Sequence, residues 1–223
     1  DTTVVAQFKA NKASLPDFLQ YEGTVHFLAW TTTPWTLPSN TALTVGPKID
    51  YVLVKTFNQY TFEPINVVLA KKLVSYQFSG KFIQVEDEVE LSSYKPEDKK
   101  IPFYIVKGFI GKDLVGITYE QLLPYALPND NPENAFRVIS GDFVTTEDGT
   151  GIVHTAPTFG ADDALVAKLA VPEVPPMLVK DEIGNNPGGC IAMGIENFWE
   201  RGEIIQKGSV NRIAKNIGNP ATC

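Results

Sequence analysis

The stretch WTTTPWTLPSN at residues 30–40 limits what this chain can fold into. The apolar run at residues 25–29 that leads into it predicts a strand. Pro34 must end that strand, because proline donates no backbone hydrogen bond and pushes the preceding residue into extended geometry. Threonine hydroxyls and freed backbone groups then collect at a strand end, where they can hold water and a small polar ligand. Threonine is also a common strand residue, so the run alone leaves a purely structural role open.

Frequent turns are the second constraint on the fold. The 223 residues include 16 prolines and 17 glycines, which is typical of a strand-rich chain with many turns. Residues 64–75 have apolar positions at helical spacing and predict a helix, and a second helix is expected over residues 162–170. The sequence Asp148-Gly149 within residues 147–151 predicts a hairpin turn. We therefore expect a β-rich mixed α/β fold, with strands at residues 3–8, 25–30, 39–45, 51–54, 104–106, 136–144 and 152–157.

Composition excludes several classes of protein. The 19 basic and 26 acidic residues give a net charge of −7, whereas nucleic-acid binders usually present a basic surface. The chain should therefore contact one nucleotide at an RNA end rather than a long stretch of RNA. Apolar runs fall short of the roughly 20 residues that a membrane helix needs. Two cysteines and two histidines make no zinc pattern, and a reduced, cytoplasmic setting is the simplest expectation.

A second group of polar residues lies at residues 149–163, which read GTGIVHTAPTFGADD. His154 lies on a predicted strand, and Asp162 and Asp163 open the predicted helix. Taken singly, a strand histidine is more often a structural group than a catalyst. Two aspartates at a helix start are more often a cap and a partner of the helix dipole, and we expect Asp162 to cap the helix.

The two motifs together resemble the editing domain, or connective polypeptide, of isoleucyl-tRNA synthetase, a class I aminoacyl-tRNA synthetase. Thr33 stands where the sister valine and leucine enzymes carry arginine, and Trp35 follows Pro34. A further similarity covers residues 111–125, where a generic strand-turn-strand is an equally good interpretation. The resemblance extends over residues 1–184, whereas residues 185–223, including a candidate short helix at residues 195–206, do not match. The aminoacylation motifs of such enzymes are absent, and the chain looks excised from something larger.

The resemblance implies a small β-barrel with peripheral helices that hydrolyses mischarged valyl-tRNA(Ile), with valyl-adenylate as a second candidate substrate. It implies that Asp163 binds the substrate ammonium, that His154 limits the pocket size, and that Trp35 contributes to substrate binding. The residues that would orient water, carbonyl and terminal adenosine are Thr31, Thr32, Thr33, Thr36 and Asn40.

Editing itself would need no cofactor, although the parent synthetase uses ATP and magnesium. The implied partners are the 3′ end of the charged tRNA and the remainder of the parent enzyme, and we expect a monomer with no membrane association. Two other classes stay open at this point. The chain could be a non-catalytic insert that guides the tRNA acceptor end, or an unrelated β-barrel hydrolase of small aminoacyl esters.

Overall fold

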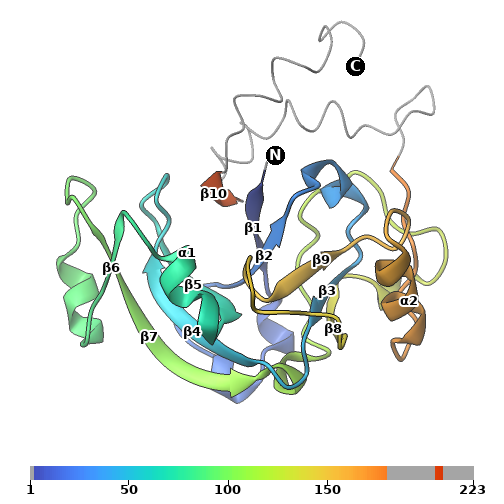
Figure 1. The fold of residues 1–223 in the computed structure, drawn as a ribbon, viewed down its shortest axis with the longest axis horizontal. Helices are drawn as coiled ribbons and strands as arrows, with labels where there is room; N and C mark the ends of the chain where they lie inside the picture. Colours follow the sequence, from blue (N-terminus) through green and yellow to red (C-terminus); the bar gives the residue numbers. More distant parts are fainter. Residues whose placement is uncertain (1–2, 180–203, 208–223) are drawn as a thin grey trace, which may run out of the picture.

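The computed structural model describes residues 3–179 and 204–207, and strands dominate this part of the chain (Figure 1). The interrupted strand at residues 25–31 and the turn-rich connections produce a mixed α/β fold built on one large sheet, as expected. The described elements are β1 Val4–Lys9, β2 Val25–Thr31, β3 Ala42–Val45, β4 Asp50–Phe57, β5 Pro64–Ala70, α1 Val74–Gln77, β6 Phe82–Gln84, β7 Ile101–Ile110, β8 Arg137–Ser140, β9 Ile152–Thr155, α2 Ala161–Leu169 and β10 Ile204–Lys207.

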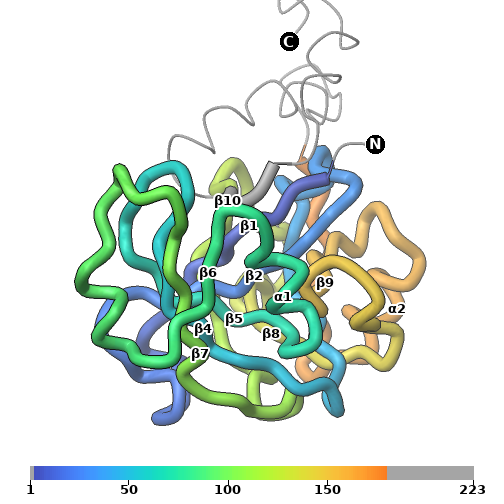
Figure 2. The backbone as a smooth tube through the Cα atoms, turned by 60° about the vertical axis from the view of Figure 1, so that its left-hand side comes forward, coloured from blue at the N-terminus to red at the C-terminus, as the bar shows by residue number. Residues whose placement is uncertain are grey.

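Strand β2 is the branch point of the sheet. It pairs antiparallel with β1 over six residue pairs, and β1 pairs in turn with β10. The other edge of β2 is shared, because β5 pairs with Val25 to Phe27 while β9 reaches Trp30. Two wings result, β5-β4-β7-β6 and β9-β3-β8, which lie on opposite sides of the molecule in Figure 1. Figure 2 is turned so that the first wing comes forward. The threonine-rich stretch therefore begins where the second wing joins β2.

The expected small β-barrel is not confirmed, because the regular strands form an open sheet. Residues 116–120 nevertheless connect β1 with β8 by backbone hydrogen bonds. The Glu120 amide donates to the Lys9 carbonyl at 2.8 Å, and the Val138 amide donates to the Ile117 carbonyl at 2.8 Å. This extended segment brings residues 111–125 against the second wing.

The helix expected over residues 64–75 is wrong. Residues 64–70 form β5, and helical structure begins only with a 3₁₀ turn at Lys71–Leu73 that leads into the short α1. Six consecutive residues of β5 are buried, so both faces of this strand are covered. A strand buried on both faces has continuous apolar residues rather than alternating ones, which makes it hard to distinguish from a helix by periodicity.

The turn at residues 147–151 is present, but it does not form a hairpin. Gly149 and Gly151 both adopt φ of 72°, a conformation that glycine accepts without strain. Strands β8 and β9 do not pair with each other, because β3 lies between them, parallel to β8 and antiparallel to β9. The helix expected over residues 195–206 lies outside the described residues except for 204–206, which are in β10.

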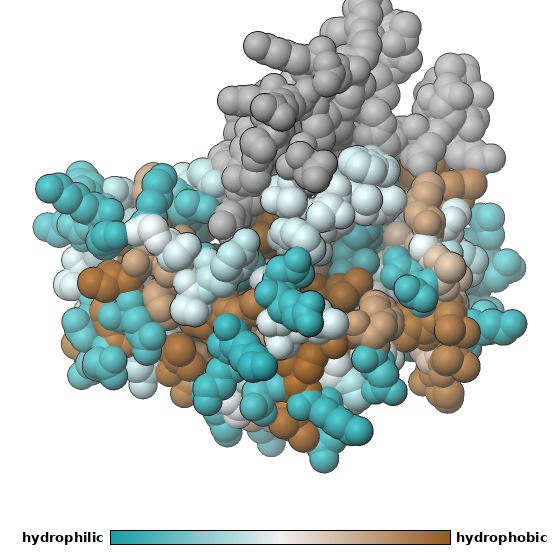
Figure 3. All heavy atoms as spheres, viewed as in Figure 1, coloured by the Kyte–Doolittle hydropathy of each residue, from teal (hydrophilic) through white to brown (hydrophobic). Residues whose placement is uncertain are grey.

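Two apolar clusters hold the sheet together. The larger contains Phe8, Phe27, Tyr51 and Tyr119, and the smaller gathers around β4 and β5 of the first wing. A third, small cluster packs Val166 and Ala167 of α2 against the second wing. Apolar side chains also reach the surface beside α2, as Figure 3 shows. Within the described residues, no helix has the length and apolar character needed to cross a bilayer.

Candidate active site

The threonine-rich stretch breaks the strand where the sequence predicts. Strand β2 ends at Thr31, and a 3₁₀ helix at Pro34–Ser39 begins with Pro34. Proline suits this first position because its missing N–H would have no partner there and its φ is already helical. The Thr36 amide donates to the Thr33 carbonyl at 3.0 Å, which closes the first turn. The sharp turn directs Thr36 back toward β9.

His154 lies on β9 and connects the two motifs. Its Nε2 is 2.8 Å from Thr36 Oγ1, and its Nδ1 is 2.9 Å from Asn40 Nδ2. The register of β3 and β9 places His154 opposite Leu43, and the side chain is 6% exposed. Burial lowers the pKa of His154 from 6.5 to about 4, so the imidazole is neutral at physiological pH. Sequence motifs 114 residues apart therefore meet in one buried cluster.

Tyr119 completes this cluster. Its hydroxyl donates to Asn40 Oδ1 at 2.6 Å, and burial raises its pKa well above 10. The sequence offered one signal for this residue, the resemblance of residues 111–125 to the editing domains, but no feature of the side chain itself indicated chemistry. We call Thr36, Asn40, Tyr119 and His154 the histidine cluster.

The remaining threonine-stretch residues differ in exposure. Thr31 is buried, and its hydroxyl accepts from the Thr33 amide at 3.0 Å. Thr32, Thr33 and Trp35 are exposed, with Trp35 at 41%. Thr33 Oγ1 lies 3.3 Å from Thr31 Oγ1 and 3.5 Å from Thr36 Oγ1. The Thr33 hydroxyl, on an exposed residue, therefore lies next to Thr36 of the histidine cluster, within reach of a ligand from solvent.

Asp163 is joined to the same strand by a backbone contact. Its Oδ2 accepts from the Ala156 amide at 2.8 Å, two residues beyond His154. Burial raises the pKa of Asp163 above 3.8, the Ala156 hydrogen bond lowers it, and the charge of Asp162 raises it further. The carboxylate is half-buried and retains accepting capacity that this one bond does not use.

The capping role expected for Asp162 is wrong. Gly160 is the N-cap of α2, no side chain caps the helix, and Asp162 lies in the first turn, exposed. An acidic residue in the first turn still interacts favourably with the helix dipole. The helix thus begins one position before the expected cap, and Asp163 instead fixes the loop between β9 and α2.

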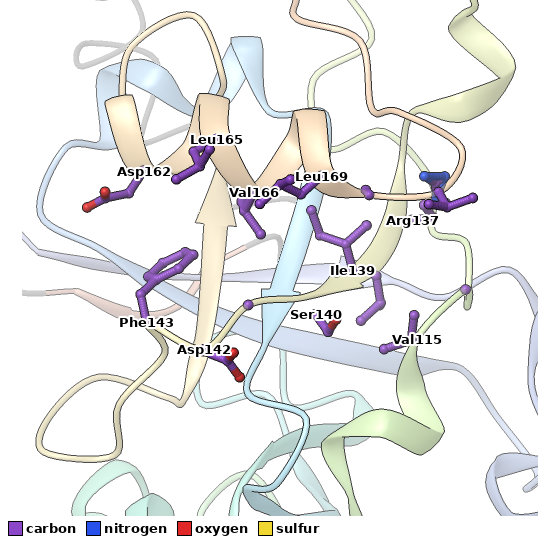
Figure 4. Close-up of a pocket in the computed structure, with 15 residues that line it drawn as sticks. Val115, Arg137, Ile139, Ser140, Asp142, Phe143, Asp162, Leu165, Val166 and Leu169 are labelled. Atoms are coloured by element: carbon purple, nitrogen blue, oxygen red, sulfur yellow. The ribbon is translucent and has the colours of Figure 1, made fainter.

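A separate cleft lies between α2 and β8, with a volume of about 610 Å³ (Figure 4). Its lining is largely apolar and includes Val115, Phe143, Leu165 and Leu169. Asp162 lies on its rim, but the cleft contains neither the threonine stretch nor the histidine cluster. In the described part of the chain, no group of three or more His, Cys, Asp or Glu side chains is placed to hold a metal ion.

The fold places the chain among known structures. The editing domains of the cytosolic leucyl-tRNA synthetases of P. falciparum and P. knowlesi superpose with TM-scores of 0.54 at 14% and 11% identity. These matches cover 97% and 98% of this chain and 84% and 86% of theirs. The chain therefore has the fold of the editing domains of class I aminoacyl-tRNA synthetases.

Sequence comparison names the branch of that class. The isoleucine–tRNA ligases of Cytophaga hutchinsonii and Porphyromonas gingivalis are 60% and 55% identical over 185 residues, 83% of this chain. That of Bacteroides fragilis is 58% identical over 184 residues, 82% of this chain. The chain belongs to the isoleucine–tRNA ligase family and spans 15% of the length of these relatives. No protein-family model matches it.

Proposed function

We propose that this chain is a deacylase that hydrolyses valyl-tRNA(Ile), with valyl-adenylate as a second candidate substrate. The observation that carries the proposal is the contact of the two motifs. Thr36 and Asn40 hold His154, while Thr32 and Thr33 stay exposed beside them. The isoleucine–tRNA ligase relatives and the editing-domain fold support the same reaction. We assign the reaction to residues 1–184.

The need for such a reaction is energetic. Isoleucine and valine differ by one methylene, which a binding pocket distinguishes by only about 1–3 kcal/mol. Isoleucyl-tRNA synthetase is the standard example of this limit, with a single-pocket discrimination of about 150-fold. A second pocket that accepts valine and rejects isoleucine supplies the missing selectivity. In this proposal the His154 side chain limits the size of that second pocket.

The proposed reaction is the hydrolysis of an ester. Water adds to the carbonyl carbon of the valyl ester, the bond to the ribose oxygen of the terminal adenosine breaks, and that oxygen takes a proton. The exposed Thr32 and Thr33 hydroxyls orient water and the carbonyl, and an adjacent ribose hydroxyl of the substrate assists the transfer. Neutral His154, with both ring nitrogens bonded, is not the base.

Asp163 supplies the charge that the substrate requires. A half-buried carboxylate is the group that best compensates a desolvated ammonium. The pKa of Asp163 is raised because burial removes water from the carboxylate and no positive charge of the described residues replaces it. A bound ammonium would supply that charge and lower the pKa. The exposed Trp35, Thr32 and Thr33 complete the proposed substrate site. The proposed partners are the 3′ end of tRNA(Ile) and the remainder of a synthetase, for a monomeric, cytoplasmic protein that needs no cofactor for editing.

The test is a deacylation assay on tRNA(Ile) charged either with valine or with isoleucine. We expect release of valine at a rate far above spontaneous hydrolysis and little release of isoleucine. The second candidate is a non-catalytic insert that only guides the tRNA end, although the net charge of −7 does not favour RNA binding. Binding of charged tRNA without release of valine would favour that insert and reject the deacylase.

A further inference from the structure

The orientation of the Asn40 amide is fixed by its neighbours. Its Nδ2 is 2.8 Å from the Ala42 carbonyl and 3.3 Å from the Thr155 carbonyl, and both oxygens can only accept hydrogen bonds. Its Oδ1 receives the Tyr119 hydroxyl at 2.6 Å. The atom that faces His154 Nδ1 at 2.9 Å is therefore the amide nitrogen, which can only donate.

This orientation decides which nitrogen of His154 carries the proton. Nδ1 must be the acceptor, so a neutral imidazole carries its hydrogen on Nε2 and donates it to Thr36 Oγ1 at 2.8 Å. The Thr36 hydroxyl then donates to the Thr33 carbonyl at 2.8 Å. The hydrogen bonds between these side chains therefore run in one direction, from Tyr119 through Asn40, His154 and Thr36 to the Thr33 carbonyl. Asn40 Nδ2 shares its two hydrogens among His154 Nδ1 and the Ala42 and Thr155 carbonyls.

We propose that Asn40 and Tyr119 are positioning residues that hold His154 as the Nε2–H tautomer. Asn40 acts on the histidine rather than on the substrate, and Tyr119 acts through Asn40. As a consequence, the Nδ1 lone pair of His154 accepts from Asn40, and the Thr36 hydroxyl proton is used in the bond to the Thr33 carbonyl. The histidine cluster is then a rigid wall of the pocket, and its rigidity allows it to exclude one methylene. This part of the inference rests on the proposed function, whereas the tautomer itself does not.

Imidazole ¹⁵N NMR of the whole chain tests the tautomer directly. The sequence contains only His26 and His154, so a His26→Gln variant assigns both signals. At neutral pH we expect His154 to be protonated at Nε2 alone. In Asn40→Asp an oxygen replaces the donating nitrogen, and we expect Nδ1 to become protonated. A wild-type proton on Nδ1, or an Asn40→Asp spectrum identical to wild type, overturns the proposal.

Two buried tyrosines allow a controlled test of whether Tyr119 affects deacylation. Tyr51 is as buried as Tyr119, and its hydroxyl donates to the Gly151 carbonyl at 2.6 Å and accepts from the Gly46 amide at 3.0 Å, without touching the histidine cluster. We expect Tyr51→Phe, which removes two hydrogen bonds, to lose at least as much stability as Tyr119→Phe, but only Tyr119→Phe to slow valyl-tRNA deacylation, by about tenfold. Equal rates in the two variants would reject Tyr119 as a positioning residue. A wild-type protein with the Nε2–H tautomer but no deacylation would reject the proposed function alone.

Discussion

The histidine cluster and the α2–β8 cleft are built in opposite ways. In the cluster, Thr36, Asn40, Tyr119 and His154 are buried, and their side chains bond to one another. The cleft has about 610 Å³ of open space, but its walls are largely apolar, with Leu165 58% exposed and Leu169 70% exposed. Buried polar groups cost stability unless they are hydrogen-bonded. A buried network whose side chains bond to one another therefore indicates a specific role. Volume alone does not mark the site.

Asp163 is bonded to Ala156, two residues beyond His154, and gives the largest expected effect. Asp163→Ala should lower the rate of valyl-tRNA deacylation by the equivalent of about 2–5 kcal/mol, because the substrate ammonium loses its charged partner. Initial rates on charged tRNA(Ile) measure this change. The matched control is Asp162→Ala on the cleft side of the same helix turn, which should retain most activity. A similar loss in both variants would mean that helix charge rather than ammonium binding matters.

The histidine cluster should also contribute to the pH dependence of stability. Burial lowers the pKa of His154 to about 4, so from pH 6.5 down to about 4 the unfolded chain binds a proton that the folded chain does not. Stability is therefore lost as pH falls through this window, by up to about 3 kcal/mol at 1.36 kcal/mol per pKa unit.

His26 contributes in the same window and must be separated from His154. Burial, followed by the charge of Lys9, lowers the pKa of His26 to about 4 as well. Urea titrations of the His26→Gln variant between pH 4 and 7 isolate the contribution of His154. If the free energy of unfolding of the variant stays constant over this range, His154 takes up a proton as easily in the folded chain as in the unfolded chain. The cleft, in contrast, contributes no histidine to this range.

Much of the candidate site was predictable because its signals are local. Pro34 ends β2 through its own covalent geometry, and the order of His154 and Asp163 along the chain carries the family pattern. Asn40 and Thr36 follow from the same motif. The structure brings Thr36, Asn40 and His154 into direct contact, and links Asp163 to this strand through Ala156.

The errors come from contacts that no local pattern encodes. Strand β5 looked helical because both of its faces are buried: Val68 and Ala70 pack into one apolar cluster, and Val67 and Leu69 pack into the other. Strands β8 and β9 looked like a hairpin, although β3 from much earlier in the chain separates them. Tyr119 was missed because its role depends on one hydrogen bond to a residue 79 positions away.

His154→Ala tests whether the cluster acts as a sieve. Removing the ring opens room for one more methylene, whose burial contributes about 0.8 kcal/mol, and it also relieves a clash with isoleucine. The ratio of isoleucyl- to valyl-tRNA deacylation should rise by about tenfold, and stability should fall because Asn40 and Thr36 lose a partner. His26→Ala is the control for loss of the other histidine, which is partly buried and lies outside the histidine cluster. An unchanged ratio would shift the sieve to Trp35 and the threonine stretch.

The cleft should give the smallest effect. Leu169→Lys alters a side chain that is already 70% exposed, so we expect the free energy of unfolding to change by no more than about 0.5 kcal/mol. Valyl-tRNA deacylation should stay within about twofold of wild type, because the cleft contains neither the threonine stretch nor the histidine cluster. Val166→Ala, one turn earlier and 8% exposed, should cost about 1–2 kcal/mol in urea unfolding while leaving the deacylation rate of the folded protein similar. A tenfold loss of activity in Leu169→Lys would place substrate in the cleft and would remove the distinction between the two regions.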